Sequence, residues 1–334
     1  MESGYRDRDA MNSTKVPPGE PREGLVIAVR PRWVMVRIGA QELRCSVPQR
    51  LRRGVRHQRT PLAVGDRVIV VIDARGTAVP VELLARRSRI SRLGSLRPPL
   101  EHVIAANVDQ LLALQAVDEP PFNPGALDRL LLLGEAGGVE CAIGLNKIDL
   151  VTPEEIVRLL APYRASGYPI FSMSAVTEEG LPELSAFLAG HETVLLGPSG
   201  VGKSTLLNRL VPGILQTTAA VSHATGRGVH TTTRVDYLDL PAGGAVVDTP
   251  GLRTIQPFGL RPAALAPLYP EFRPYLGGCH FGDCLHEGEP GCAVTEAVAQ
   301  GKIARVRHDS YVRVLTGLRL EGVFLKIDPD AERE

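Results

Sequence analysis

Several features are scarce in this sequence, and each scarcity excludes a class of protein. In 334 residues no apolar run reaches the roughly 18 residues that a membrane span needs, and the polar N-terminus lacks the apolar segment of a secretory signal. The five cysteines are few and unevenly placed, which argues against a disulfide framework. We therefore expect a soluble cytoplasmic protein with no membrane partner.

Lysine is absent from residues 22–98, yet this segment is strongly basic. It holds 17 arginines against five acidic residues, a net charge of +12, whereas the whole chain carries +1. Two arginine clusters stand out, one at 50–59 and one at 86–92. Guanidinium groups suit phosphate oxygens, and many such contacts give strong, salt-dependent binding to a polyanion. We favour RNA binding over the alternative of a solvated basic surface.

The same segment contains short β-type runs, such as LVIAV and DRVIVVID, separated by turn residues. This pattern predicts a small β-barrel, and the OB-fold is the natural candidate because its face binds oligonucleotides. Aromatic residues are sparse here, with Trp33 the sole tryptophan of the chain. We therefore expect recognition of RNA backbone and shape rather than stacking on bases.

Residues 193–209, TVLLGPSGVGKSTLLNR, are typical of a buried strand, a glycine loop and a helix. The loop fits G-x-x-x-x-G-K-[ST], whose backbone N–H groups surround a polyphosphate at a helix N-terminus. We expect Lys203 to reach the β- and γ-phosphates and the Ser204 hydroxyl to ligate Mg²⁺. A chance glycine turn is the alternative, which the flanking strand and helix disfavour. The predicted nucleotide contacts are Gly197, Pro198, Ser199, Gly200, Val201, Gly202, Lys203, Ser204 and Thr205.

Two motifs upstream indicate that the nucleotide is GTP or GDP. Residues 103–117 are expected to form the first strand of this domain, and a later strand from Cys141 ends in N-K-x-D. The Asp of that motif can accept both the N1–H and the 2-amino hydrogens of guanine, a pair that adenine lacks. A further strand ends in S-A, similar to the loop that holds guanine O6. Alone, either motif could be an ordinary turn. The residues concerned are Asn146, Lys147, Asp149, Ser174 and Ala175.

Two segments after the glycine loop predict the switches of a GTPase. Residues 217–233 are polar and end in GRGVHTTT, where Thr231 or Thr232 is expected to meet Mg²⁺ and the γ-phosphate; a flexible loop is the alternative. The run AVVDTPG then places Asp248 at the end of an apolar strand. We expect Asp248 to hold Mg²⁺ through water and the Gly251 N–H to sense the γ-phosphate.

The order of these motifs is unusual. Conventional GTPases run P-loop, switch threonine, D-x-x-G, N-K-x-D and S-A, whereas here N-K-x-D and S-A come first. Such a circular permutation keeps a site intact when the original termini lie close together. The order predicts a permuted α/β P-loop GTPase whose second switch directly precedes the next domain.

The segment that follows carries a cluster of cysteines and histidine in the pattern C-x₄-C-x-H-x₅-C. Three thiolates and one imidazole give a closed tetrahedral shell, which favours one structural Zn²⁺ over a catalytic one. Free cysteines on a loop and a metal-dependent hydrolase are the alternatives. Residues 293–299 and 303–315 look helical. The expected ligands are Cys279, Cys284, His286 and Cys292, with His280 as a possible substitute.

Taken together, the motifs resemble those of the ribosome small-subunit-dependent GTPases of the RsgA (YjeQ) family. The resemblance covers about residues 22–320 and rests on GPSGVGKST, GRGVHTTT, DTPG, NKID and CHFGDCLHEGEPGC in the permuted order. It implies an OB-fold domain, a permuted GTPase and a zinc domain acting late in maturation of the 30S subunit. It also implies binding to 16S rRNA and hydrolysis stimulated by the subunit. An RNA-binding protein that uses GTP only as a conformational ligand is the alternative.

One position bears on the rate of hydrolysis. Leu252 stands where many GTPases place a glutamine that orients water, so we expect slow intrinsic hydrolysis. His230 is the candidate to position the water, with a plain polar loop residue as the alternative.

The predicted organisation is multi-domain, and we expect a monomer. Its parts are a disordered tail at 1–21, an OB-fold RNA-binding domain at 22–98, the permuted GTPase at 99–265, a mostly helical zinc-binding domain at 266–326 and a tail at 327–334.

Overall fold

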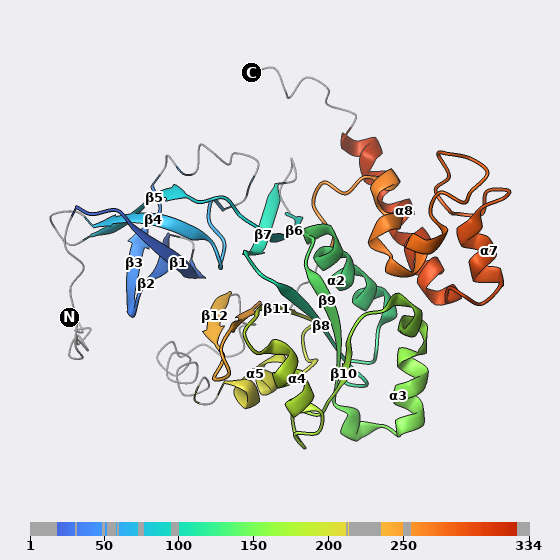
Figure 1. Cartoon of the computed structure of the whole chain (residues 1–334), viewed down its shortest axis with the longest axis horizontal. Coiled ribbons are helices and arrows are strands. Elements are labelled where there is room, and N and C mark those ends of the chain that lie inside the picture. Colours follow the sequence, from blue (N-terminus) through green and yellow to red (C-terminus); the bar gives the residue numbers. More distant parts are fainter. Residues whose placement is uncertain are drawn as a thin grey trace, which may run out of the picture.

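The protein folds into three regions that follow one another along the chain (Figure 1). The computed structural model describes residues 19–30, 32–48, 51, 58, 60–72, 77–94, 100–211, 213, 235–249 and 255–325. A β-sheet domain comes first, then an α/β domain, then a domain of short helices. The predicted multi-domain fold class is confirmed. Within the described ranges, no helix is both long enough and apolar enough to cross a membrane.

The N-terminal domain is a curled antiparallel sheet. β1 pairs with β2 at one edge and with β4 at the other, β2 pairs with β3, and β4 pairs with β5. The end strands β3 and β5 are in contact, so the sheet closes on itself. Burial alternates along β2 and β4, which places one face of each strand on an apolar core. The strands are β1 (Arg22–Val29), β2 (Trp33–Ile38), β3 (Gln41–Ser46), β4 (Arg67–Ile72) and β5 (Ala78–Leu83).

The central domain is an open sheet in the order β10-β9-β8-β11-β13-β12, parallel except for β12. All residues of β8 are buried, as expected for a parallel strand covered on both faces. The strands are β8 (Gln110–Ala116), β9 (Glu140–Asn146), β10 (Ile170–Ser172), β11 (Glu192–Leu196), β12 (Asp236–Asp239) and β13 (Ala245–Asp248).

Helices cover both faces of this sheet. Apolar side chains of α2 and α3 pack on one face, in the same core cluster as Leu111 and Ala113 of β8. Side chains of α4 and α5 pack on the other face, with Leu112 and Leu114. This alternation along one strand is the two-residue period of a strand buried on both sides. The helices are α2 (Pro124–Gly137), α3 (Pro153–Leu160), α4 (Leu181–Leu188) and α5 (Lys203–Leu210).

The single strand expected over residues 103–117 is wrong, because the chain breaks there into two strands. β7 (Glu101–Ala106) lies outside the central sheet and pairs with β6 (Arg89–Leu93) in a separate two-stranded sheet. At the break, Asn107 adopts a left-handed backbone conformation with φ 57°. Its side-chain amide donates to the Gly65 carbonyl oxygen at 2.9 Å and accepts from the backbone N–H of Arg87 at 2.8 Å. An asparagine tolerates this conformation better than the apolar residues around it.

The C-terminal domain has its own apolar core, which also includes Leu132 of α2. Aromatic rings of Tyr269, Phe272 and Tyr311 stack or meet edge to face in that core. The helix predicted at 293–299 is present. The helix predicted at 303–315 begins at Arg305 and continues to Leu325. The elements are η3 (Pro262–Ala264), η4 (Ala266–Leu268), η5 (Pro270–Tyr275), α7 (Ala293–Ala299) and α8 (Arg305–Leu325).

A buried arginine joins the C-terminal domain to the GTPase domain. The side chain of Arg307, on α8, is 2% exposed and forms ion pairs with Asp128 of α2 and Glu271 of η5. Its guanidinium lies 5.1 Å from the ring centre of Tyr163 and 4.8 Å from that of Tyr269. The Tyr163 hydroxyl also donates to Asp128, at 2.9 Å. Because all these groups are buried, the two domains are held as one packed unit.

We expect Arg307→Leu to destabilise the protein by about 3–5 kcal/mol, because it leaves two buried carboxylates without their cation. Urea unfolding followed by circular dichroism measures the change. The matched control is Arg313→Leu, an exposed position on the same helix, which should shift the transition little. Equal shifts for the two variants would contradict the role of Arg307 in holding the two domains together.

Candidate nucleotide-binding site

The glycine loop connects the carboxyl end of β11 to the N-terminus of α5, as predicted from its pattern. The Lys203 ammonium donates to the carbonyl oxygens of Gly197 and Pro198, at 2.7 and 2.9 Å. Burial lowers the pKa of Lys203, while the Asp248 carboxylate opposes that shift. The cation is therefore held over the loop, where the phosphates of a nucleotide are expected.

Asn146 joins the glycine loop to the S-A loop. Its Nδ2 donates to the carbonyl oxygen of Val201 at 2.8 Å, and its Oδ1 accepts from the backbone N–H of Ala175 at 3.0 Å. A Cβ atom on Gly202 would lie 2.3 Å from that Nδ2, and Gly202 has φ +93°, so only glycine allows this approach. Three motifs that are far apart in the sequence therefore meet at one buried amide.

The side chains expected to bind guanine lie at the end of β9 and after β10. Asp149 is exposed in a short 3₁₀ helix (Ile148–Leu150) that follows β9. Ser174 is fully buried, and its Oγ accepts from the backbone N–H groups of Val176 and Thr177, at 3.2 and 3.1 Å. These bonds hold the loop in shape. The backbone N–H of the next residue, Ala175, is engaged by Asn146 here.

Lys147 is fixed by the turn that follows β8. It adopts φ 64°, and its Nζ donates to the carbonyl oxygen of Glu119. In the same turn, the Cδ atom of Pro120 lies 3.2 Å from the Cβ position of Gly200. The turn therefore borders the glycine loop, a contact that no motif in the sequence signals.

Asp248 is the last residue of β13, the position expected from its motif, and its role in holding Mg²⁺ stays a prediction. Burial raises the pKa of Asp248 to about 6, Lys203 opposes the rise, and Asp236, directly opposite on β12, adds to it. Ser204 is an exposed residue in the first turn of α5. Carboxylate and hydroxyl oxygens are the ligands that Mg²⁺ prefers, so this donor set suits that ion.

Some predicted residues lie outside the described part of the chain. They are Thr231, Thr232 and His230 of the first switch, Gly251 and Leu252 of the second, and the arginine cluster at 50–59. Their roles stay predictions.

The Cys and His cluster of the C-terminal domain is drawn together as predicted. The Nδ1 atom of His286 lies 3.4, 3.6 and 3.5 Å from the sulfur atoms of Cys279, Cys284 and Cys292. All four ligand atoms lie within 4.8 Å of one another. Corners of a tetrahedron around Zn²⁺, at bond lengths of about 2.0–2.3 Å, are about 3.5 Å apart, so the geometry fits that ion. His280, the possible substitute, is not one of the four.

Glu289 organises the backbone between these ligands. Its carboxylate accepts from the backbone N–H groups of Leu285, Glu287 and Gly288, at 2.8, 2.8 and 3.1 Å. Burial works against ionisation, but these bonds lower the pKa of Glu289 to about 2. From α8, His308 bonds to the carbonyl oxygen of His286 at 2.7 Å. The cluster is thus preformed by its own loop and braced by α8.

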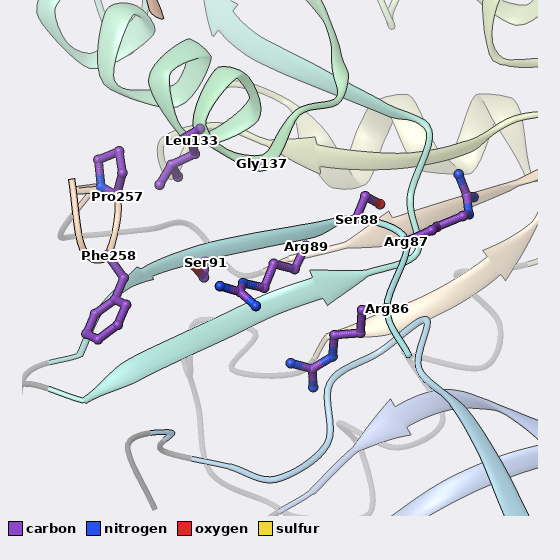
Figure 2. A pocket seen from close by; sticks show the side chains of 10 residues that line it. Arg86, Arg87, Ser88, Arg89, Ser91, Leu133, Gly137, Pro257 and Phe258 are labelled. Carbon is purple, nitrogen blue, oxygen red and sulfur yellow. The ribbon is translucent and has the colours of Figure 1, made fainter. Parts of the chain in front are cut away.

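A cavity of about 300 Å³ lies away from the glycine loop, between the linker to β6 and helix α2 (Figure 2). Three arginines of the 86–92 cluster line this cavity. Each of them pairs with a carboxylate: Arg86 with Asp66, Arg87 with Asp109 and Arg89 with Glu101. Arg86 therefore ties the linker to the barrel, Arg87 ties it to the GTPase domain, and Arg89 ties β6 to β7. The cavity is lined by Arg86, Arg87, Ser88, Arg89, Ser91, Leu133, Ala136, Gly137, Pro257 and Phe258.

Comparison with known proteins identifies the family. A family model described as RsgA GTPase matches residues 83–258. The chain is 43% identical over 260 residues to the small ribosomal subunit biogenesis GTPase RsgA of Gemmatimonas aurantiaca, covering 77% of this chain and 85% of that one. The chain belongs to the RsgA GTPase family. Its predicted resemblance to that family is confirmed, and so is the prediction of a GTPase.

Two solved structures support the family assignment and the permuted order. YjeQ from Thermotoga maritima superposes with a TM-score of 0.69 and 32% identity, covering 90% of this chain and 99% of that one. YloQ, described as a circularly permuted GTPase, gives a TM-score of 0.66 and 26% identity, covering 93% and 99%. The circular permutation predicted from motif order is confirmed.

We expect Glu289→Gln to accelerate zinc loss to a chelator by about 10-fold or more, because a charge-assisted bond network of the ligand loop is weakened. The release is followed with a colorimetric zinc indicator. Asp283→Asn, an exposed position in the same loop, is the matched control and should release zinc at the wild-type rate. Similar rates for both variants would refute the role of Glu289.

Proposed function

We propose that this protein is a GTP hydrolase that acts in late maturation of the small (30S) ribosomal subunit and binds its 16S rRNA. The observation that carries the proposal is the Asn146 amide, which joins the glycine loop to the S-A loop in the permuted arrangement. Membership of the RsgA GTPase family supports the activity. The printed name of the Gemmatimonas relative supports the partner.

In the proposed mechanism, Lys203 exchanges its two carbonyl partners for the β- and γ-phosphate oxygens. This exchange is favourable because a buried ammonium gains charged acceptors. Mg²⁺, held by Ser204 and through water by Asp248, would neutralise charge on the same phosphates. Backbone N–H groups of the glycine loop and of the first turn of α5 would hold the phosphates in place, as at other helix N-termini.

Base recognition in this proposal depends on Asp149. The exposed carboxylate accepts the N1–H and the 2-amino group of guanine, while the Lys147 ammonium is kept in place by the bond it donates to the Glu119 carbonyl oxygen. Asn146 belongs to the same proposal, because one hydrogen of its Nδ2 group goes to the Val201 carbonyl oxygen and the second can donate to the base. Its two bonds within the protein also keep the base-binding and phosphate-binding halves in register.

We expect small subunits to accelerate single-turnover GTP hydrolysis by the full chain by about 100-fold or more, the lower end of what one well-placed catalytic group contributes. The control is Lys203→Ala, which should abolish hydrolysis with and without subunits. Equal rates with and without subunits would favour the alternative, in which GTP acts only as a conformational ligand. Hydrolysis that survives Lys203→Ala but stops on zinc removal would instead locate the chemistry at the cysteine cluster.

We expect Asp149→Asn to weaken GTP binding by about 100-fold or more and to strengthen binding of xanthosine triphosphate, because an amide can donate to the xanthine 2-oxygen. Titration with fluorescent nucleotide analogues measures both. Asp309→Asn, at an exposed position of α8, serves as a control that changes charge equally. Loss of affinity for both nucleotides alike would argue against Asp149 as the base reader.

A further inference from the structure

The barrel meets the GTPase domain along β12, the strand that follows the predicted first switch. Asp236 of β12 pairs with Ala28 of β1, so one sheet continues from the GTPase domain into the barrel (Figure 1). Arg30 forms an ion pair with Asp236 at 2.5 Å. Arg37 forms one with Asp239 at 2.8 Å. We call these two ion pairs the β12 seam.

Further contacts of the same kind surround the seam. The guanidinium of Arg37 lies 5.8 Å from the ring centre of Tyr237, and the Tyr237 hydroxyl donates to Glu192 at 3.0 Å. Glu192, at the start of β11, also lies within 3.9 Å of Arg67 and 3.5 Å of Arg87. Arginines of the barrel and linker thus face carboxylates of the GTPase domain along its edge.

The seam is weak compared with the Arg307 joint. The side chains of Asp236 and Asp239 are 38% and 59% exposed, and those of their partners Arg30 and Arg37 are 16% and 24% exposed. Solvent-exposed ion pairs contribute about 0.2–1 kcal/mol each, and salt screens a pair whose carboxylate is open to solvent. The seam is therefore the joint at which another anion can replace a protein carboxylate at little cost.

The seam lies next to the phosphate-binding end of the nucleotide site. Across the β12–β13 pair, Asp236 stands directly opposite Asp248. Arg30 balances the charge of Asp236 in the free protein. Removing that arginine leaves an unbalanced carboxylate beside the residue that we expect to hold Mg²⁺.

We propose that Arg30 and Arg37 form a binding surface for RNA backbone phosphates that β12 covers in the free protein. Asp236 and Asp239 occupy the two guanidinium groups in place of phosphate, and Glu42 of the barrel shares the guanidinium of Arg37. When the barrel docks on RNA, phosphates replace them and β12 is released from the barrel. The inference rests on the proposed function for its partner, and it makes the seam the place where RNA binding is communicated to the GTPase domain.

The test uses the full chain carrying Asp236→Asn and Asp239→Asn together. Removing both competing carboxylates should tighten binding to a short RNA duplex by about 2- to 30-fold, the equivalent of two exposed ion pairs. The matched control is Glu179→Gln with Glu183→Gln, which removes two exposed carboxylates elsewhere in the GTPase domain. Affinity that is unchanged, or changed only as much as in the control, would overturn the proposal.

A second measurement follows β12 itself. Backbone amides of residues 235–239 in the wild-type chain should exchange hydrogen faster when the RNA duplex is added, while those of β9 should not change. Unchanged or slower exchange in β12 would also overturn the proposal. Neither measurement involves hydrolysis or subunits. An absence of subunit-stimulated hydrolysis would therefore refute the proposed function but leave the outcome of these two RNA-binding measurements unchanged.

Discussion

The buried amide of Asn146 is the interaction on which the nucleotide site depends. Only an amide supplies a donor to the Val201 carbonyl and an acceptor for the Ala175 N–H at once. An aspartate of the same shape would leave the carbonyl facing a carboxylate. Because of this bond, Gly202 has no room for a side chain. A permutation of the chain changes which loop comes first, but it leaves this contact intact.

The other two domains are attached to the GTPase domain in physically different ways. The C-terminal domain is held through Arg307, whose partners are all buried, so it moves with α2. The barrel is held in two places: by the buried bond from Asn107 to the Gly65 carbonyl oxygen, and by the partly exposed ion pairs and one strand pairing of the β12 seam. Salt and polyanions act on the β12 seam far more than on the buried Arg307 joint. We therefore expect the barrel to be the domain that responds to RNA.

Local patterns predicted much of this structure from the sequence. The glycine loop, the N-K-x-D motif and the metal cluster each depend on spacing within a few residues, and the structure brings the described members of each together. Their order along the chain was enough to predict the permutation, which YloQ supports.

Pairings between distant residues could not be predicted in this way. Arg307 lies in a polar stretch of α8, where an arginine is ordinarily exposed, and its partners are 179 and 36 residues away. The break at Asn107 depends on Gly65 and Arg87. The arginine excess pointed to RNA, yet Arg30, Arg37, Arg86, Arg87 and Arg89 are paired with carboxylates of this chain. Composition shows how many charges a domain carries but not which are already neutralised.

We propose that nucleotide state and subunit binding are coupled through one permuted site. Equilibrium binding of the full chain to small subunits, with a non-hydrolysable GTP analogue and with GDP, tests this coupling. Coupling between two sites is typically 5- to 150-fold in affinity, so we predict that the two dissociation constants differ by about 5-fold or more. Equal affinities in the two nucleotide states would contradict the claim.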